Sequence, residues 1–143
     1  MDSIALSWVP QGTFHHVGFV VASIQDVVER YTQAIEAEWD GVIVSDPYQS
    51  VRVTFLRGKS AADPLLELIE PAGDNSPVLS FLKRGGGIHH LCYVVESLER
   101  QLEACRSKGM LLLRPPLPAT AFGNRRIAWA CTLDRFLIEY LER

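Results

Sequence analysis

The sequence predicts an α+β fold made of two tandem βαβββ modules, and three observations lead to this prediction. A short phrase occurs twice, because residues 14–21 read FHHVGFVV and residues 88–95 read IHHLCYVV. The two copies lie 74 residues apart in a chain of 143, so one unit fills each half. Each copy precedes an amphipathic helical pattern and then further strands. From this order we expect two curved antiparallel sheets with the helices on their outer faces.

The first half, residues 13–71, is expected to contain four strands and one helix. Its first strand covers residues 13–22 and is rich in Val and Phe. Ser23 is placed to cap a helix over residues 24–37, which has one apolar face. The remaining strands are apolar runs bounded by turn residues, at 41–45, 51–57 and 65–70. Residues 1–12 are expected to form an irregular arm.

A linker rich in Pro, Gly, Asp, Asn and Ser separates the halves. It leads into a predicted linker helix over residues 76–84, with Pro77 at the first helical position. The second half, residues 86–142, repeats the plan of the first. Its expected elements are a strand at 88–95, a helix at 98–108, strands at 110–113, 125–132 and 136–141, and a Pro-rich loop at 114–124. Residues 13–142 are therefore predicted to form a single domain.

Composition narrows the classes of function. The chain is 48% hydrophobic and 22% charged, which is typical of a folded core. A net charge of −3 offers no basic surface, so no nucleic-acid partner is expected. No run approaches the roughly 20 apolar residues that span a membrane, and no signal peptide is apparent. With three widely spaced cysteines, expected to be reduced and buried, these features indicate a cytoplasmic protein without a membrane partner.

Strand alternation predicts which histidine of each pair faces a cavity. Successive side chains of a strand point to opposite faces. In both copies one face carries bulky apolar residues, which should pack against the helices, and the other carries smaller residues, which leave space. This assigns His16 and His90 to the cavity. His15 and His89 are expected near the helix side or the strand end, with a structural role favoured.

The last strand of each half adds a carboxylate within an apolar run. Glu67 follows His16 by 51 residues, and Glu139 follows His90 by 49. An unpaired buried carboxylate is costly, and a divalent cation would supply its partner. Two imidazoles and two carboxylates suit Zn, Ni, Co, Fe or Mn, with positions left for water or substrate. A lone strand histidine is more often a packed residue, but the recurrence of both residue types favours a metal site.

Several phrases resemble the vicinal oxygen chelate superfamily, and within it the methylmalonyl-CoA epimerases most closely. They are LELIEP at 66–71, DNSPVLSFL at 74–82, GGIHHL at 86–91 and LIE at 137–139. The superfamily also includes glyoxalase I, extradiol dioxygenases and the bleomycin and fosfomycin resistance proteins. The resemblance implies paired βαβββ modules in a curved mixed sheet, and a homodimer. It also implies a divalent metal ion held by His16, Glu67, His90 and Glu139.

The chain departs from the epimerase pattern at two places. Val53 stands where a second acidic residue is expected, and residues 130–135 lack a His-Pro-Lys-Ser-like loop. With that acid missing, Glu67 and Glu139 are the residues expected to move the proton. Arg125 and Arg126 follow a flexible loop and are expected to bind the substrate, since Arg suits a phosphate or carboxylate. A solvated strand edge is an equally good interpretation of these two arginines.

The resemblance implies a metal-dependent epimerase or isomerase that acts on a small molecule such as an acyl-thioester. It would abstract a proton next to a carbonyl or thioester while the metal ion stabilises the resulting enolate. Three alternatives stay open. They are a glyoxalase I-type lyase, an oxygen-activating dioxygenase, and a resistance protein that binds its ligand without catalysis.

Overall fold

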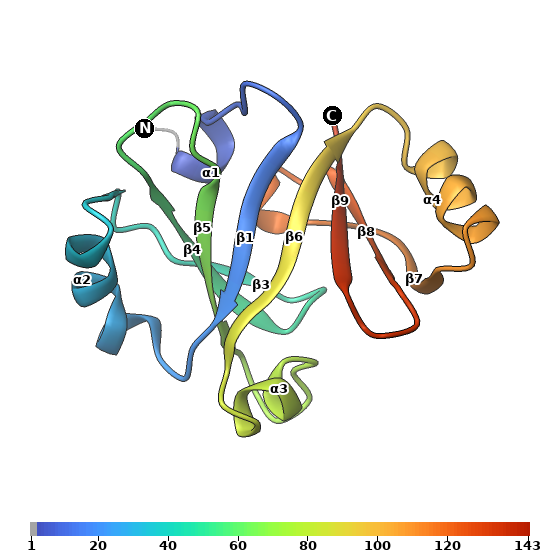
Figure 1. The fold of residues 1–143 in the computed structure, drawn as a ribbon. Helices are drawn as coiled ribbons and strands as arrows, with labels where there is room; N and C mark the ends of the chain where they lie inside the picture. Colours follow the sequence, from blue (N-terminus) through green and yellow to red (C-terminus); the bar gives the residue numbers. More distant parts are fainter. Residues whose placement is uncertain (1–2) are drawn as a thin grey trace.

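The computed structural model describes residues 3–143, in which the repeated plan of the sequence is visible (Figure 1). A short helix, α1 (Ile4–Ser7), precedes the first half. The first half comprises β1 (Phe14–Val20), α2 (Ile24–Ala34), β2 (Glu38–Trp39), β3 (Val44–Asp46), β4 (Val51–Arg57) and β5 (Leu65–Pro71). After α3 (Leu79–Lys83), the second half comprises β6 (Gly87–Val95), α4 (Leu98–Ser107), β7 (Leu111–Pro118), the 3-10 helix η1 (Thr120–Phe122), β8 (Arg126–Cys131) and β9 (Leu137–Glu142).

The strands of residues 3–143 form one mixed sheet, so the expectation of two antiparallel sheets is wrong. Their order is β2-β4-β5-β1-β6-β9-β8-β7, with β3 paired to β4. In each half the first and last strands run parallel, β1 beside β5 and β6 beside β9. The halves join where β1 and β6 pair antiparallel at the centre. The predicted α+β class and its curved mixed sheet of two βαβββ modules are confirmed.

The two long helices cover opposite outer parts of the sheet (Figure 1). Ile24 and Val28 of α2 pack with Leu68 of β5. Leu98 of α4 packs with Ala128 of β8. Full burial of a side chain such as Ile24 contributes roughly 1.5–3 kcal/mol, which offsets the ordering of the helix. A third apolar cluster lies on the inner face of the sheet and surrounds the site described below.

Several elements differ from their predicted bounds. Helix α2 ends at Ala34 instead of residue 37, β3 covers Val44–Asp46 instead of residues 41–45, and the short strand β2 was not expected. Residues 4–7 are helical, because Ser3 caps this turn and Ile4 N–H donates to the Asp40 carboxylate at 2.7 Å. The linker helix begins at Leu79, with no side-chain cap, instead of at residue 76. Strand β7 continues through Pro118 where a loop was expected. An edge strand tolerates proline because one side of its backbone needs no hydrogen-bond partner.

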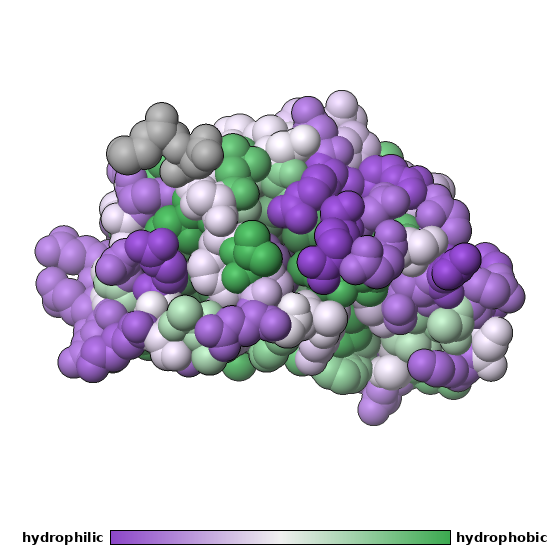
Figure 2. Space-filling model, turned by 90° about the horizontal axis from the view of Figure 1, so that it is seen from above, coloured by the Kyte–Doolittle hydropathy of each residue, from purple (hydrophilic) through white to green (hydrophobic). Residues whose placement is uncertain are grey.

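The distribution of hydrophilic residues on the surface and the burial of the cysteines agree with the folded protein that the composition predicted. Seen from above, hydrophilic residues cover both ends of the molecule and hydrophobic residues are visible between them (Figure 2). Cys92, Cys105 and Cys131 are all buried and free of disulfides, as predicted. Among residues 3–143, no helix has both the length and the hydropathy needed to cross a membrane.

Candidate metal centre

Two β-bulges in the pairing of β1 with β6 control where the histidines point. His15 is the extra residue between the Phe14–Tyr93 and His16–Cys92 pairs. His89 is the extra residue of the opposite strand, since Gly18 pairs with His90 and Phe19 already pairs with Ile88. A bulge redirects the side chain of the extra residue. His15 therefore contacts the inner-face cluster and His89 lines the inner cavity, so neither lies on the helix side as simple alternation predicted.

The four residues chosen from the sequence come together at the centre of the sheet. Their side-chain donor atoms all lie within 4.8 Å of one another. Nε2 of His16 is 3.0 Å from Oε1 of Glu139 and 3.4 Å from Oε1 of Glu67. Nε2 of His90 is 3.4 Å from each of the same two oxygens. We call His16, Glu67, His90 and Glu139 the His–Glu cluster.

The geometry of the His–Glu cluster fits a divalent metal ion. The two Nε2 atoms are 3.3 Å apart, similar to the nitrogen–oxygen distances. Neighbouring ligands around one ion have such separations when the metal–ligand bonds are about 2.0–2.2 Å long. All four residues are buried, and Oε1 of Glu139 has no hydrogen-bond partner within the described residues. A buried carboxylate oxygen without a partner is costly, and a cation between the donors would provide one.

Mutual contacts control the ionisation of the cluster. Burial alone would lower the pKa of His16, but Cys92 and Glu67 outweigh it and hold the pKa well above its ordinary value. Burial likewise opposes ionisation of His90, whose pKa the two glutamates nevertheless raise. For Glu67 and Glu139, burial favours the neutral acid, but the imidazoles bring both pKa values below the ordinary value. In the absence of a metal ion these contacts therefore favour protonation of the imidazoles and ionisation of the carboxylates.

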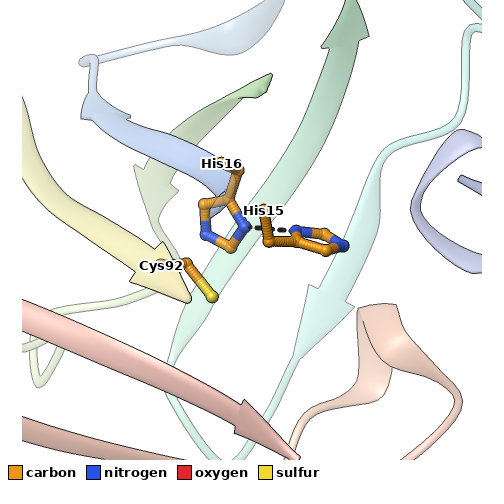
Figure 3. Close-up of side chains that lie close together, drawn as sticks. All are labelled: His15, His16 and Cys92. Atoms are coloured by element: carbon orange, nitrogen blue, oxygen red, sulfur yellow. Dashed lines mark hydrogen bonds between the residues drawn. The ribbon is translucent and has the colours of Figure 1, made fainter. Parts of the chain in front are cut away.

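Each histidine of the His–Glu cluster contacts the histidine that precedes it in the sequence, through Nδ1 of both rings. We call His16 and His90 the inner histidines and His15 and His89 the outer histidines, by their distance from the centre of the cluster. The distance between Nδ1 atoms is 2.8 Å for His15 and His16, and 2.9 Å for His89 and His90. Figure 3 shows the first pair beside Cys92 of the neighbouring strand. Burial, followed by the neighbouring His16, lowers the pKa of His15 to about 3. Burial and His90 lower the pKa of His89 to about 4, so both outer rings are neutral at physiological pH.

Gly18 makes room for the ring of His90. These residues are opposite each other in the sheet, and a Cβ at position 18 would overlap the imidazole. We expect Gly18→Ala to destabilise the fold by about 1–3 kcal/mol, the usual cost of overpacking, and to weaken metal binding by displacing the ring. Chemical denaturation and zinc titration measure the two effects. Gly12→Ala is the matched control, because its Cβ would meet nothing within 4 Å. Equal stability of the two variants would contradict this steric account.

A cavity of about 230 Å³ opens beside the cluster and is lined mainly by apolar side chains. Glu67, His90 and Glu139 form part of its wall. Val53 also lines it, at the position where a second acid was expected. The full lining is Asp46, Gln49, Val51, Val53, Glu67, Ile69, Pro77, Val78, His89, His90, Leu113, Arg114, Ala119, Ala121, Phe122, Ile127, Trp129, Leu137 and Glu139. Such a cavity suits a small, largely apolar group.

The two arginines expected to bind substrate lie outside this lining. Arg126 forms ion pairs with Glu142 and Glu99, which raise its pKa above the ordinary value. Arg125 donates from Nε to the Phe122 carbonyl at 3.3 Å. Within residues 3–143, the one Lys or Arg that lines the cavity is Arg114. Sequence reasoning missed it because residues 114–124 were expected to be a loop.

Asp46 is another polar residue of the cavity lining that the sequence did not indicate. Its Oδ1 accepts hydrogen bonds from the backbone N–H groups of Tyr48, at 3.0 Å, and Gln49, at 3.1 Å. Burial raises the pKa of the Asp46 carboxyl above its ordinary value. These bonds stabilise the turn after β3. No feature of the sequence pattern distinguishes this buried Asp from an exposed turn residue.

Comparison with known proteins agrees with this site. A model of the Glyoxalase/Bleomycin resistance protein/Dioxygenase superfamily matches residues 15–129. The chain belongs to this superfamily. The matched region includes His16, Glu67 and His90 of the cluster, and Glu139 follows it.

Relatives within the superfamily include several named epimerases. The ethylmalonyl-CoA/methylmalonyl-CoA epimerase of Cereibacter sphaeroides is 30% identical over 104 residues, which are 71% of this chain and 75% of that protein. The mitochondrial methylmalonyl-CoA epimerase of Dictyostelium discoideum is 27% identical over 118 residues, covering 79% and 67% of the two chains.

Solved structures agree in fold over nearly the whole chain. The methylmalonyl-CoA epimerase of Mycobacterium tuberculosis superposes with a TM-score of 0.79 at 26% identity, covering 95% of this chain and 93% of that one. A variant of the Streptomyces coelicolor methylmalonyl-CoA epimerase, in complex with 2-nitronate-propionyl-CoA, gives a TM-score of 0.78 at 25% identity. That match covers 92% of this chain and 94% of the other.

Proposed function

We propose that this protein is a metal-dependent epimerase that removes and returns the proton next to the thioester carbonyl of an acyl-CoA. The observation that carries the proposal is the buried His–Glu cluster, whose donor atoms lie within 4.8 Å of one another beside an apolar cavity. The names of the related proteins support an acyl-CoA substrate. So does the acyl-CoA analogue present in the Streptomyces coelicolor structure.

In this proposal His16, Glu67, His90 and Glu139 hold one divalent ion, which is Zn, Ni, Co, Fe or Mn. Nitrogen and oxygen donors in this ratio suit all five metals. When bound, the ion supplies a positive charge that stabilises the enolate oxygen as the neighbouring carbon loses its proton. The apolar wall of the cavity excludes water, which strengthens that electrostatic stabilisation.

The proton is moved by Glu67 and Glu139 in this proposal. Epimerisation needs a proton acceptor on one face of the carbon and a donor on the other. The two glutamates come from opposite halves of the fold, from β5 and β9, and both line the cavity. Their lowered pKa values favour the carboxylate, the form that accepts a proton, so the glutamate on the opposite face must first take up one proton before it can act as the donor. Val53 is apolar and cannot take this role.

We also propose that Arg114, rather than Arg125 or Arg126, contacts a negatively charged group of the substrate. Among residues 3–143, its guanidinium makes only long contacts of 3.5 Å, to Oε1 of Gln49 and the carbonyl of Tyr48. Neither partner is a carboxylate, so the charge of Arg114 is available to a ligand. A phosphate or carboxylate of an acyl-CoA would complete its hydrogen bonding.

Arg114→Gln is expected to raise KM about tenfold and to change kcat by less than about twofold, because a charge-assisted hydrogen bond is worth about 1.5 kcal/mol or more. Steady-state kinetics with an acyl-CoA substrate measures both constants. Arg57→Gln is the control, since Arg57 pairs with Glu38 and lies outside the cavity lining. An unchanged KM in the Arg114 variant would remove this residue from the substrate site.

The proposed function is tested by following solvent deuterium into acyl-CoAs. The metal-loaded protein should catalyse incorporation of deuterium into the acyl-CoA at the carbon next to the thioester, and a chelator should abolish this exchange. Methylmalonyl-CoA and ethylmalonyl-CoA are the first substrates to examine. No exchange in any acyl-CoA, together with turnover of a glutathione hemithioacetal, would favour the glyoxalase I-type reaction instead. Binding of an acyl-CoA without any turnover would favour a non-catalytic role.

Two further expectations stay predictions. The homodimer follows from the likeness to the superfamily, and sedimentation equilibrium would test it. A cytoplasmic location is expected from the three free, buried cysteines.

A further inference from the structure

The outer histidines have no part in the proposed chemistry, although each contacts an inner histidine. The two Nδ1–Nδ1 distances, 2.8 Å and 2.9 Å, are those of hydrogen bonds. Such a bond between ring nitrogens needs one N–H donor and one lone-pair acceptor. Both contacts arise from the same device, a β-bulge that turns two consecutive imidazoles to one face of the sheet.

The direction of each bond follows from the other nitrogen of the inner ring. Nε2 of His16 and Nε2 of His90 both point to the carboxylates of the His–Glu cluster. A metal ion held there would take the Nε2 lone pair, so the proton of a neutral inner ring would have to be on Nδ1. The inner ring is then the donor, and the outer ring must accept at Nδ1 and carry its own proton on Nε2.

We propose that His15 and His89 are positioning residues, which hold the rings of His16 and His90 with the Nε2 lone pair directed to the metal ion. This inference rests on the proposed function, because it requires that the His–Glu cluster holds a divalent metal ion.

At each bulge a small opposite residue leaves space for the two rings, and aromatic side chains contact the outer ring. The residues opposite the bulges are small, Cys92 for the first pair and Gly18 for the second. Trp8 and Phe122 hold the ring of His15 edge-on, with centroid distances of 5.1 Å and 5.2 Å. Phe81 contacts the ring of His89 in the same way at 4.9 Å.

The surroundings of His15 argue against a purely structural role. The residue is only 1% exposed, and its Nε2 has no hydrogen-bond partner among residues 3–143. Leaving a buried ring N–H without an acceptor costs free energy that a phenyl ring of similar size would avoid. Within the part of the chain that the structure describes, the one polar contact of the side chain is its bond to His16. An imidazole at this position is therefore explained by the acceptor it offers to His16.

The test compares zinc affinity, measured by competition with a chelator, in the wild type and in His15→Phe. The phenyl ring keeps the contacts with Trp8 and Phe122 but offers no acceptor to His16. Affinity is expected to fall about 10–100-fold, the usual effect of removing the hydrogen-bond partner of a ligand histidine. His89→Phe should lower it by a similar factor. Trp8→Phe is the control, because it changes the packing of His15 but leaves the Nδ1–Nδ1 bond, and its affinity should stay close to that of the wild type.

A second measurement needs no substitution. Long-range proton–nitrogen correlation spectra of the zinc-loaded wild type should show His16 protonated at Nδ1 and His15 at Nε2. The opposite tautomers would overturn the inference, as would wild-type zinc affinity in both Phe variants. A wild type that binds no zinc and no cobalt would overturn the proposed function as well. Failure of the inference alone is thus distinguishable from failure of the metal site, and the spectra decide it even where a Phe variant folds poorly.

Discussion

Glu67→Gln is expected to lower turnover by roughly 10²–10⁴-fold, the usual contribution of a positioned proton acceptor, while the protein still binds a divalent metal ion. Glutamine keeps the size of glutamate and one ligand oxygen, but it cannot take a proton at neutral pH. The effect should therefore fall on kcat more than on metal content. Turnover is measured by deuterium exchange and metal content by elemental analysis of the same sample.

The two glutamates should differ in which enantiomer they serve. If they flank the substrate carbon, Glu67→Gln abolishes exchange from one enantiomer and Glu139→Gln abolishes it from the other. Glu70→Gln is the matched control, because Glu70 lies on the same strand but bonds Arg52 and the backbone of Ile24 outside the cavity. A parallel loss of metal and turnover in Glu67→Gln would mean that Glu67 is a ligand only.

Metal binding should depend steeply on pH and release protons. The raised pKa values of His16 and His90 mean that both rings are protonated in the metal-free protein below those values. Each must lose a proton before its Nε2 can bind a metal ion. Apparent affinity should therefore fall as the pH falls, by up to about tenfold per pH unit for each proton released. Since both pKa values lie above 6.5, the dependence should extend above that pH.

Calorimetry in buffers of different ionisation enthalpy counts these protons directly. Between pH 6 and 8 we expect the number released per zinc ion to be well above zero and to approach two at the acidic end. The lowered pKa values of Glu67 and Glu139 predict no contribution from the carboxylates in this range. Zinc binding that is independent of pH over the same range would show that the imidazoles are already neutral, contrary to the contacts seen in the cluster.

The sequence repeat was informative about the fold and the cluster because it records a symmetry that the structure retains. The HH phrase and the apolar run around each Glu occur at matching places in both halves, and the structure brings these four side chains together. Alternation correctly separated Val21, which packs under α2, from Val20 on the inner face. Such patterns depend only on local periodicity, which a single sequence displays.

Features that depend on pairing between distant strands could not be predicted in this way. The bulges at His15 and His89 exist only in the register of β1 against β6, so uniform alternation, which left the helix side or the strand end open for both rings, could not place them on the inner face. The parallel pairing of β1 with β5 has no local signature either. Arg114 was assigned to a loop because prolines follow it, although an edge strand accommodates them. Arg126 seemed available until the fold placed Glu142 and Glu99 beside it.

The antiparallel seam between β1 and β6 has an implication for ancestry. Each half contributes one nitrogen and one oxygen donor, so a half-length precursor would hold two donors and would assemble a complete centre only as a pair of identical copies. Fusion of two genes would have made that pairing permanent. It would also have allowed the two copies to diverge in sequence, as Gly18 and Cys92 have done at equivalent positions of the repeated phrase.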